Sequence, residues 1–233
     1  MALYAIGDLH LPLGVDKPMD IFGKRWENHV ERLKENWQNT VTDEDTVVLA
    51  GDFSWATYLE ESKKDFEFLN SLPGKKIMLK GNHDYWWSTI NKMQEFLKKN
   101  GFSQIDFLQN NSFEYKDISI CGSRGWTMPQ MKSSEEDKRI YARELIRMEL
   151  SLKSAKNPEN IFAFTHYPTV MNGFLENEMT GLFKKYGVKK SFFGHIHLAF
   201  FGIKSIFEGE ENGIEYSLVS ADYREFMPVK IAD

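Results

Sequence analysis

Histidine, aspartate and asparagine gather in a few short clusters of this sequence. Five of the six histidines lie in them, and each cluster follows a run of apolar residues. The clusters are Gly7-Asp8-Leu9-His10, Gly51-Asp52, Gly81-Asn82-His83-Asp84, Thr165-His166-Tyr167 and Gly194-His195-Ile196-His197. Imidazole, carboxylate and amide groups are common ligands of transition metals in proteins. If the clusters meet in space, they form a metal site in both type and number of ligands.

The spacing within the clusters favours this interpretation. Side chains two apart on extended backbone point the same way, so Asp8 and His10 can share an ion, as can His195 and His197. Taken singly, Gly-Asp after a strand is commonly a turn, and His166 is typical of a structural histidine. The sixth histidine, His29, lies on a predicted amphipathic helix, where we interpret it as a packing residue. All the clusters together, each after a strand, favour a functional site.

The segments before these clusters read as buried strands. Six runs rich in β-branched or aromatic residues begin at Leu3, Thr46, Lys75, Ile118, Asn160 and Lys189. Near-continuous apolar runs indicate strands covered on both faces, as in a parallel or mixed sheet packed by helices. Open α/β sheets bind ligands beyond the carboxyl ends of their strands. Neighbouring strands would therefore deliver the clusters to one place.

Three helices are predicted between the strands. Apolar residues at three- and four-residue spacing form a stripe over residues 22–37 that consists of Phe22, Trp26, Val30, Leu33 and Trp37. A second helix is predicted to begin at the cap Ser88 and to end at Asn100-Gly101. A third lies between Ser133 and Ala155. Its opposite face carries Arg139, Arg143 and Arg147, which we interpret as a solvated face rather than a phosphate-binding row.

The C-terminal part differs from the rest. Residues 210–213 read Glu-Glu-Asn-Gly between two β-like segments, a strong hairpin signal. The sequence therefore predicts an α/β protein whose later strands form a second, partly antiparallel sheet. No linker, repeat or low-complexity tract divides it, so residues 1–233 are predicted to be one domain.

Composition narrows the class of protein. The chain has 233 residues, 42% hydrophobic and 27% charged, which is ordinary for a globular protein large enough to bury a core. The single cysteine, Cys121, suits a reducing compartment, and no signal peptide or membrane span is recognisable, so a cytoplasmic location is expected. A formal net charge of −5 argues against broad nucleic-acid binding but allows a small phosphorylated substrate.

The ordered clusters resemble the motifs of the calcineurin-like metallophosphoesterase superfamily. Its five motifs are Asp-x-His, Gly-Asp, Gly-Asn-His-Asp/Glu, His and Gly-His-x-His, and here they cover residues 7 to 197. The resemblance implies a four-layer α/β/β/α sandwich with two mixed β-sheets and a dinuclear metal site at the carboxyl ends of the strands.

The resemblance also implies a role for each residue. Asp8, His10 and His197 would bind one metal, Asn82, His166 and His195 the other, and Asp52 would bridge the two. His83 would be the general acid beside the leaving group, and Asp84 would orient and polarise His83. Mixed nitrogen and oxygen ligands suit two divalent or trivalent ions of Mn, Fe, Zn, Co or Ni better than calcium. Paired metals can generate hydroxide near neutral pH for in-line attack on a phosphoester.

Departures from the superfamily's branches limit the substrate. The second motif lacks the Asp-Arg-Gly extension of the serine/threonine protein phosphatases, so the chain resembles instead the compact bacterial predicted phosphohydrolases. Monoester and diester substrates both stay open. The alternative is an inactive scaffold for protein binding, but such scaffolds tend to lose the general acid or some ligands. Here His83 and all seven ligands are present, which favours the enzyme.

Residues around the motifs would select the substrate. Five aromatic residues lie near motif loops or strand ends, namely Trp55, Tyr85, Trp86, Trp87 and Trp126. They would either stack on a nucleobase, contact an apolar alcohol, or form the edge of the core. Arg124 follows a strand and is either a bidentate phosphate clamp or the partner in a structural ion pair.

Overall fold

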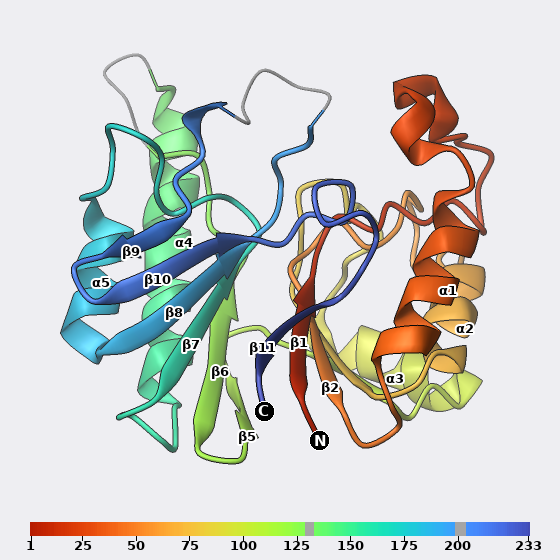
Figure 1. Ribbon diagram of the computed structural model, residues 1–233, viewed down its shortest axis with the longest axis horizontal. Coiled ribbons are helices and arrows are strands. Elements are labelled where there is room, and N and C mark those ends of the chain that lie inside the picture. The colour runs from red at the N-terminus through yellow and green to blue at the C-terminus, as the bar shows by residue number, and fades with distance from the viewer. Residues whose placement is uncertain (129–132, 199–203) are drawn as a thin grey trace.

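The computed structural model of the protein describes residues 1–128, 133–198 and 204–233. Its first sheet has the order β11-β1-β2-β3-β4. These strands are β11 (Val229–Ala232), β1 (Leu3–Ile6), β2 (Thr46–Leu49), β3 (Lys75–Met78) and β4 (Ile105–Phe107). Strands β1 to β4 are parallel, whereas β11 runs antiparallel to β1. The chain thus returns to its first strand at its end, and both termini lie at the lower side of the view in Figure 1.

The second sheet is also mixed and has the order β5-β6-β7-β8-β10-β9. These strands are β5 (Ser112–Tyr115), β6 (Ile118–Ser123), β7 (Ile161–Thr165), β8 (Val188–Phe193), β10 (Ile214–Leu218) and β9 (Gly209–Glu211). The four central strands are parallel, and antiparallel strands close both edges. This confirms the predicted second, partly antiparallel sheet, and all six strands expected from the sequence are present.

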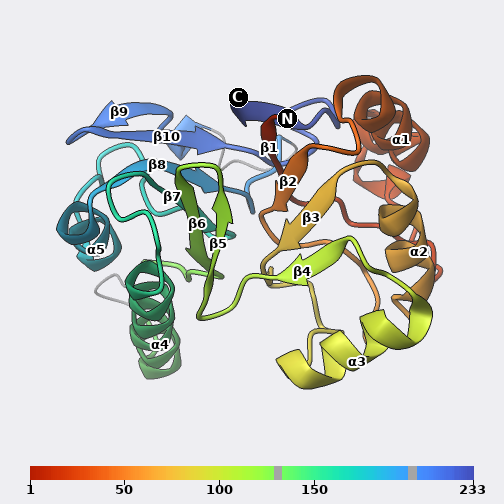
Figure 2. The same ribbon diagram turned by 90° about the horizontal axis from the view of Figure 1, so that it is seen from below.

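Helices cover the outer side of each sheet. The first sheet is covered by α1 (His29–Thr40), α2 (Lys63–Ser71) and α3 (Ile90–Asn100), and the second by α4 (Glu135–Lys153) and α5 (Glu178–Tyr186). Figure 2 shows the four layers side by side, with the two sheets face to face. The predicted α/β/β/α sandwich is confirmed.

Strand residues alternate between the buried clusters that join the layers, because successive side chains point to opposite faces of a sheet. In β2, Val47 and Leu49 pack under the helices, while Val48 packs between the sheets. In β7, Phe162 and Phe164 pack between the sheets, while Ala163 faces α4 and α5. Both faces of each central strand are therefore buried, which explains the near-continuous apolar runs.

The helix predicted over residues 22–37 is shorter in the structure. Short 3₁₀ helices span Asp20–Phe22 and Lys24–Trp26, and α1 begins only at His29. Gly23 and Asn28 have positive φ angles of 113° and 50°, which interrupt the helical path. Trp26, Leu33 and Trp37 are buried as expected, but Phe22 is 41% exposed.

Two further boundaries differ from the sequence expectation. The cap of α3 is Thr89 rather than Ser88, since the Thr89 side chain accepts a hydrogen bond from the backbone N–H of Lys92. The predicted hairpin turn is present at Asn212 and Gly213, whose positive φ angles match a type I′ turn. Its first strand has only three residues, and residues 199–203 of the segment expected before it lie outside the described residues.

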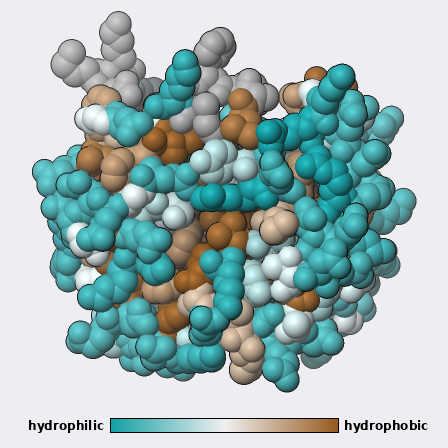
Figure 3. Space-filling model, in the orientation of Figure 1, coloured by the Kyte–Doolittle hydropathy of each residue, from teal (hydrophilic) through white to brown (hydrophobic). Residues whose placement is uncertain are grey.

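The surface seen in Figure 3 is mostly hydrophilic, with hydrophobic residues showing mainly near its centre and on its left side. Within the described part of the chain, no helix combines the length and the apolar character needed to cross a bilayer.

Replacing Leu33 by Ala tests the packing of α1. Leu33 is fully buried in the cluster beneath the helices, so the change should lower the free energy of unfolding by about 2–5 kcal/mol. Urea denaturation followed by circular dichroism measures this loss. The neighbouring control Lys34→Ala, on the exposed side of α1, should stay within about 0.5 kcal/mol of the parent protein. Equal losses in both variants would contradict the assigned helix orientation.

Candidate metal centre

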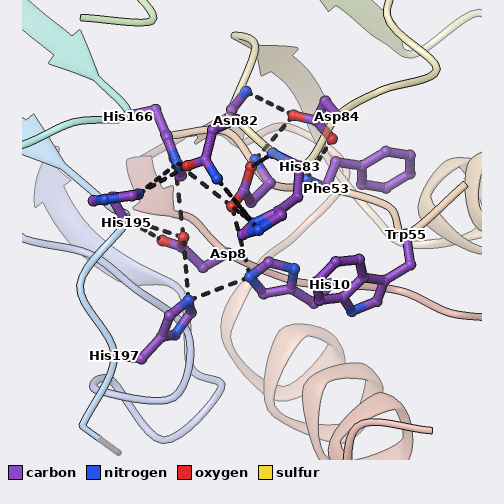
Figure 4. Close-up of polar contacts among 12 residues, drawn as sticks. Asp8, His10, Phe53, Trp55, Asn82, His83, Asp84, His166, His195 and His197 are labelled. Carbon is purple, nitrogen blue, oxygen red and sulfur yellow. Dashed lines mark hydrogen bonds and ion pairs between the residues drawn. The ribbon is translucent and has the colours of Figure 1, made fainter. Parts of the chain in front are cut away.

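The carboxyl ends of five parallel strands bring the polar clusters together. Asp8 and His10 follow β1, Asp52 follows β2, and Asn82 follows β3 in the first sheet. His166 follows β7, and His195 and His197 follow β8 in the second sheet. Figure 4 shows side chains from both sheets pointing toward one another across the junction. The structure thus places all seven predicted ligands in one site.

The loops that carry these residues have unusual backbone conformations. Asp8, His10, Asp52 and His195 all have positive φ angles, between 46° and 73°. Non-glycine residues in this region cost about 1–3 kcal/mol each and persist only where the surroundings enforce them. Four of the seven candidate ligands are therefore held in strained conformations, a pattern typical of functional sites.

Glycines of the motifs make room for the carboxylates. A Cβ atom on Gly81 would lie 2.0 Å from Oδ1 of Asp52, and one on Gly194 would lie 2.3 Å from Oδ2 of Asp8. Both distances are far inside van der Waals contact, so a side chain at either position would displace a carboxylate. The glycines of Gly-Asn-His-Asp and Gly-His-x-His are thus explained by close packing against Asp52 and Asp8.

One group of donors consists of Asp8, His10 and His197, whose ligand atoms all lie within 4.8 Å of one another. The Nε2 atoms of His10 and His197 are 3.3 Å apart, and Nε2 of His197 is 3.8 Å from Oδ1 of Asp8. The backbone N–H of His195 donates to both oxygens of Asp8 at 3.0 Å, which fixes that carboxylate.

A second group consists of Asn82, His166 and His195. Oδ1 of Asn82 lies 2.7 Å from Nε2 of His166 and 2.8 Å from Nδ1 of His195. The two imidazole nitrogens are 3.2 Å apart. Oδ2 of Asp52 lies between the two groups, 3.4 Å from Nε2 of His166 and 3.7 Å from Nε2 of His10. This position is the one a bridging carboxylate requires.

The donors fit a cation on chemical grounds. Nδ1 of His166 donates to the carbonyl oxygen of Ala50 at 3.0 Å, so in the neutral imidazole Nε2 carries a lone pair. That lone pair faces the oxygen atoms of Asn82 and Asp52. Acceptors that converge in this way repel one another unless a cation lies among them. The mixed nitrogen and oxygen set suits transition metals better than calcium.

Sequence reasoning missed Asp222, which contacts His197. Nδ1 of His197 donates to Oδ1 of Asp222 at 2.9 Å, and the backbone N–H of Leu198 donates to Oδ2 at 2.9 Å. Burial would lower the pKa of His197, but the hydrogen bond to Asp222 and the nearby Asp8 raise it to about 9. Asp222 follows β10, and its position after a strand is the feature of the sequence from which it could have been predicted. Carboxylates in this position orient metal-binding histidines.

The two buried carboxylates differ in electrostatic environment. Burial raises the pKa of Asp8 to about 6. Burial also acts to raise the pKa of Asp52, but the imidazole of His166 and the hydrogen bond from His83 lower it below its usual range. Asp52 is therefore the more strongly ionised of the two.

His83 lies beside the donor groups and is 34% exposed. Its backbone N–H donates to Oδ1 of Asp52 at 2.7 Å, and its ring Nδ1 donates to Oδ2 at 2.8 Å. The hydrogen bond to Asp52 raises the pKa of His83. Its ring also contacts the Trp55 ring, with centroids 4.8 Å apart. His83 is thus held at the edge of the site, open to a ligand.

Asp84 is placed differently from the sequence expectation. Its carboxylate accepts hydrogen bonds from the backbone N–H groups of Asp52 and Phe53 at 2.9 Å and of Gly81 at 2.7 Å, and from Nε1 of Trp86 at 3.0 Å. Among the described contacts, the His83 ring bonds to Asp52 and Asn82 rather than to Asp84. Asp84 therefore orders the loop that carries Asp52 and does not contact the His83 ring.

The aromatic residues separate into site and core. Trp55 stacks on His10 with ring centroids 4.8 Å apart, whereas Trp86 is 2% exposed and packs in the core. Nε1 of Trp87 donates to the Gln109 side chain and Nε1 of Trp126 to Asp137, while Tyr85 is 60% exposed. A cavity of about 160 Å³ beside the donors is walled by Trp55, Met19, Phe22 and Trp26, with His10, His83 and His197 at its base.

Arg124 and the arginine row lie outside this cavity. Nη2 of Arg124 is 3.7 Å from Glu144, and its guanidinium covers the Trp126 ring at 4.5 Å. Arg139 and Arg143 are exposed, as expected for a solvated face. Arg147 differs, because its Nη1 donates to Glu144 at 2.8 Å.

The sequence matches the family model of the calcineurin-like phosphoesterases over residues 1–199. The chain belongs to the calcineurin-like phosphoesterase family. Members of this family hydrolyse phosphoesters with the help of bound metal ions, and the aspartate and histidine groups of this site can hold such ions. Among curated proteins, none matches the sequence.

Solved structures similar to this calcineurin-like phosphoesterase share its fold at low identity. The phosphopantetheinyl hydrolase PptH from Mycobacterium tuberculosis is 12% identical, with a TM-score of 0.60 and with 99% of this chain and 95% of that chain covered. A protein of unknown function from Aquifex aeolicus is 18% identical, with a TM-score of 0.51 and coverage of 98% and 94%. A protein from Thermus thermophilus is 10% identical, with a TM-score of 0.52 and coverage of 99% and 97%.

Replacing Asp222 by Asn tests the support of His197. Removal of such a carboxylate typically weakens metal binding about 10–100-fold, because the imidazole loses its orientation and its charged partner. Titration of the protein with Mn²⁺ or Zn²⁺ against a competing chelator measures the affinity. Asp106→Asn, at a surface ion pair with Lys75, serves as the control and should bind metal like the parent protein. Unchanged affinity in the Asp222 variant would remove Asp222 from the metal site.

Proposed function

We propose that this protein is a dinuclear metal-dependent phosphohydrolase of small phosphorylated substrates. One metal would be held by Asp8, His10 and His197, the other by Asn82, His166 and His195, with Asp52 between them. The observation that carries the proposal is the position of Asp52, whose Oδ2 lies within 4 Å of a nitrogen of each donor group. When bound there, the metals would activate a water molecule and hold the phosphate oxygens during in-line displacement.

His83 is proposed as the general acid. Its ring forms part of the cavity beside the donors and is partly exposed, so it can reach the leaving group of a bound ester. The hydrogen bond between Nδ1 and Asp52 orients the ring and stabilises its protonated form. An imidazole in this state can give a proton to a departing alkoxide. Asp84 supports this arrangement indirectly, by holding the loop around Asp52.

The cavity next to His83 supports an apolar or aromatic leaving group. Its walls are Met19, Phe22, Trp26 and Trp55, and the Trp55 ring already stacks against His10. Such walls favour flat or alkyl groups over strongly hydrated ones. A nucleobase or a hydrophobic alcohol fits this description, and a phosphopantetheinyl compound belongs in the substrate panel because PptH shares the fold.

Hydrolysis by the metal-loaded protein tests the proposal directly. The protein is reconstituted with Mn²⁺, Fe²⁺, Zn²⁺, Co²⁺ or Ni²⁺ and assayed on p-nitrophenyl phosphate and bis-p-nitrophenyl phosphate. A panel of nucleotides and a phosphopantetheinyl compound follows. We expect metal-dependent release of p-nitrophenolate, which a chelator abolishes and added metal restores. Turnover of the diester would assign a phosphodiesterase, and turnover of the monoester alone a phosphatase. Inactivity with every metal would favour a binding scaffold instead.

Replacing His83 by Ala tests the general acid. On an alkyl phosphate, whose leaving group needs a proton, the rate constant kcat should fall by about 10²–10⁴-fold. On p-nitrophenyl phosphate, whose leaving group departs as the anion, the loss should be much smaller. Metal content measured by elemental analysis should match the parent protein and so exclude loss of the metals. Full turnover of the alkyl phosphate by the variant would contradict the assignment.

A further inference from the structure

A second cavity lies at the same end of the sandwich and has a different chemical character. It has a volume of about 200 Å³, well above the roughly 10–15 Å³ that one bound water requires. Its wall includes Lys80 after β3, Asn110 between β4 and β5, and Ser123 and Arg124 at the end of β6. Glu144 and Arg147 of α4 line it as well, and the rest of the wall is Trp87, Ser88, Leu108 and Gln109. The cavity at His83 shares none of these residues, so the two are separate.

Positive charge exceeds negative charge in this cavity. Lys80, Arg124 and Arg147 face the single carboxylate of Glu144, which leaves an excess of two positive charges. Glu144 is fully buried and interacts with both arginines, through Nη1 of Arg147 at 2.8 Å and Nη2 of Arg124 at 3.7 Å. Among the described residues, the Lys80 ammonium has no hydrogen bond or ion pair, and Nε of Arg124 is buried without a partner. Ion pairing with Glu144 therefore does not account for all three cations.

Contacts of the backbone place this cavity beside the second donor group. Lys80 precedes Asn82 by two residues, which bounds the separation of their Cα atoms at about 7 Å. The carbonyl oxygen of Arg124 accepts hydrogen bonds from the backbone N–H groups of His166 and Tyr167, each at 3.0 Å. In Figure 4, Asn82 and His166 lie on one side of the cluster, while Trp55 and His10 lie on the other. The charged cavity thus adjoins the side away from the aromatic wall.

The guanidinium groups are held in place before any ligand binds. Arg124 is covered by the Trp126 ring and its side chain is only 14% exposed, while Glu144 holds Arg147. Arginine forks bind phosphate oxygens in a planar, bidentate manner, and a nearby lysine adds a point charge. Hydroxyl and amide groups of Ser123 and Asn110 offer further hydrogen bonds to the same oxygens.

We infer that Lys80, Arg124 and Arg147 form an anion-binding pocket for a phosphate dianion beside the metal centre. The dianion is either a second phosphate group of the substrate or free inorganic phosphate. In the first case the inference rests on the proposed function, since the pocket would select substrates that carry two phosphates. In the second case the pocket binds phosphate whether or not the protein hydrolyses esters.

Direct binding tests the pocket without any catalytic readout. The metal-loaded full-length protein is titrated with inorganic phosphate by isothermal calorimetry. We expect one binding event at the metals and one at the pocket, and Arg147→Gln should weaken the second about tenfold, as loss of a charge-assisted hydrogen bond does. Arg147→Lys should restore part of the affinity. Arg143→Gln, an exposed arginine of the same helix outside the pocket, is the matched control and should bind like the parent protein.

Substrate selectivity then identifies the source of the phosphate. The ratio of kcat/KM for a nucleoside 3′,5′-bisphosphate to that for the matching 5′-monophosphate is measured in the parent protein and in Arg147→Gln. A ratio that falls about tenfold in the variant assigns the pocket to a substrate phosphate. An unchanged ratio together with weakened phosphate binding assigns it to free phosphate.

The inference is overturned if Arg147→Gln binds phosphate as tightly as the parent protein. Thermal unfolding of each variant checks that the fold is intact, and Lys80→Met provides a second variant that leaves the Glu144 ion pairs in place. If phosphate binds at the pocket of a protein that hydrolyses no substrate, the proposed function is contradicted but the anion-binding pocket is supported. If the protein hydrolyses phosphoesters but binds no phosphate at the pocket, the proposed function is supported and the pocket is contradicted.

Discussion

The rest of the site depends on the interactions of the Asp52 carboxylate. It accepts hydrogen bonds from the backbone and the ring of His83, and its Oδ2 atom lies within 4 Å of Nε2 of both His10 and His166. It fits there only because Gly81 has no side chain. Asp84 in turn binds the backbone N–H of Asp52 and holds the positive φ angle of that residue. The Gly-Asn-His-Asp segment therefore positions the aspartate of the Gly-Asp segment.

Burial of so many ionisable groups is tolerable only if their charges compensate one another. Asp8 and Asp52 are almost completely buried, and an unpaired buried carboxylate is costly. Without a metal the imidazole of His166 and the hydrogen bond from His83 lower the pKa of Asp52, while the hydrogen bond to Asp222 and the nearby Asp8 raise the pKa of His197 to about 9. Two metal ions would compensate the buried charges more fully, and metal binding at His197 would release the proton that its raised pKa retains. Protons and metal ions would therefore compete for this cluster.

The surroundings of the cluster divide into two kinds of surface. The aromatic cavity beside His83 and the charged cavity beside Asn82 share no residue. Family membership accounts for phosphoester chemistry at the centre but not for these cavities, since the three solved structures compared above are 10–18% identical and show the shared fold alone. The two cavities are walled by different segments, notably residues 19–26 for the first and the end of β6 and the middle of α4 for the second.

Local patterns in the sequence were sufficient to predict the strands, their burial and the polar clusters at their ends. Apolar runs such as those ending at Leu49 and Thr165 identify strands buried on both faces, and motif order alone points to Asp8, His10, Asp52, Asn82, His166, His195 and His197. The start of α1 could not be predicted from the apolar spacing, because that spacing continues through Gly23 and Asn28. The positive φ angles of these two residues interrupt the helix there.

Tertiary structure alone decided which partner each polar group meets. Asp84 turned toward the loop of Asp52 rather than the ring of His83, and Asp222 came to His197 across a separation of 25 residues. Arg124, Arg147 and Lys80 became neighbours through the packing of α4 on β6 and of one sheet on the other. Residue type sets which bonds a side chain can form, but the choice among possible partners depends on distances of a few ångström, which only the folded chain defines.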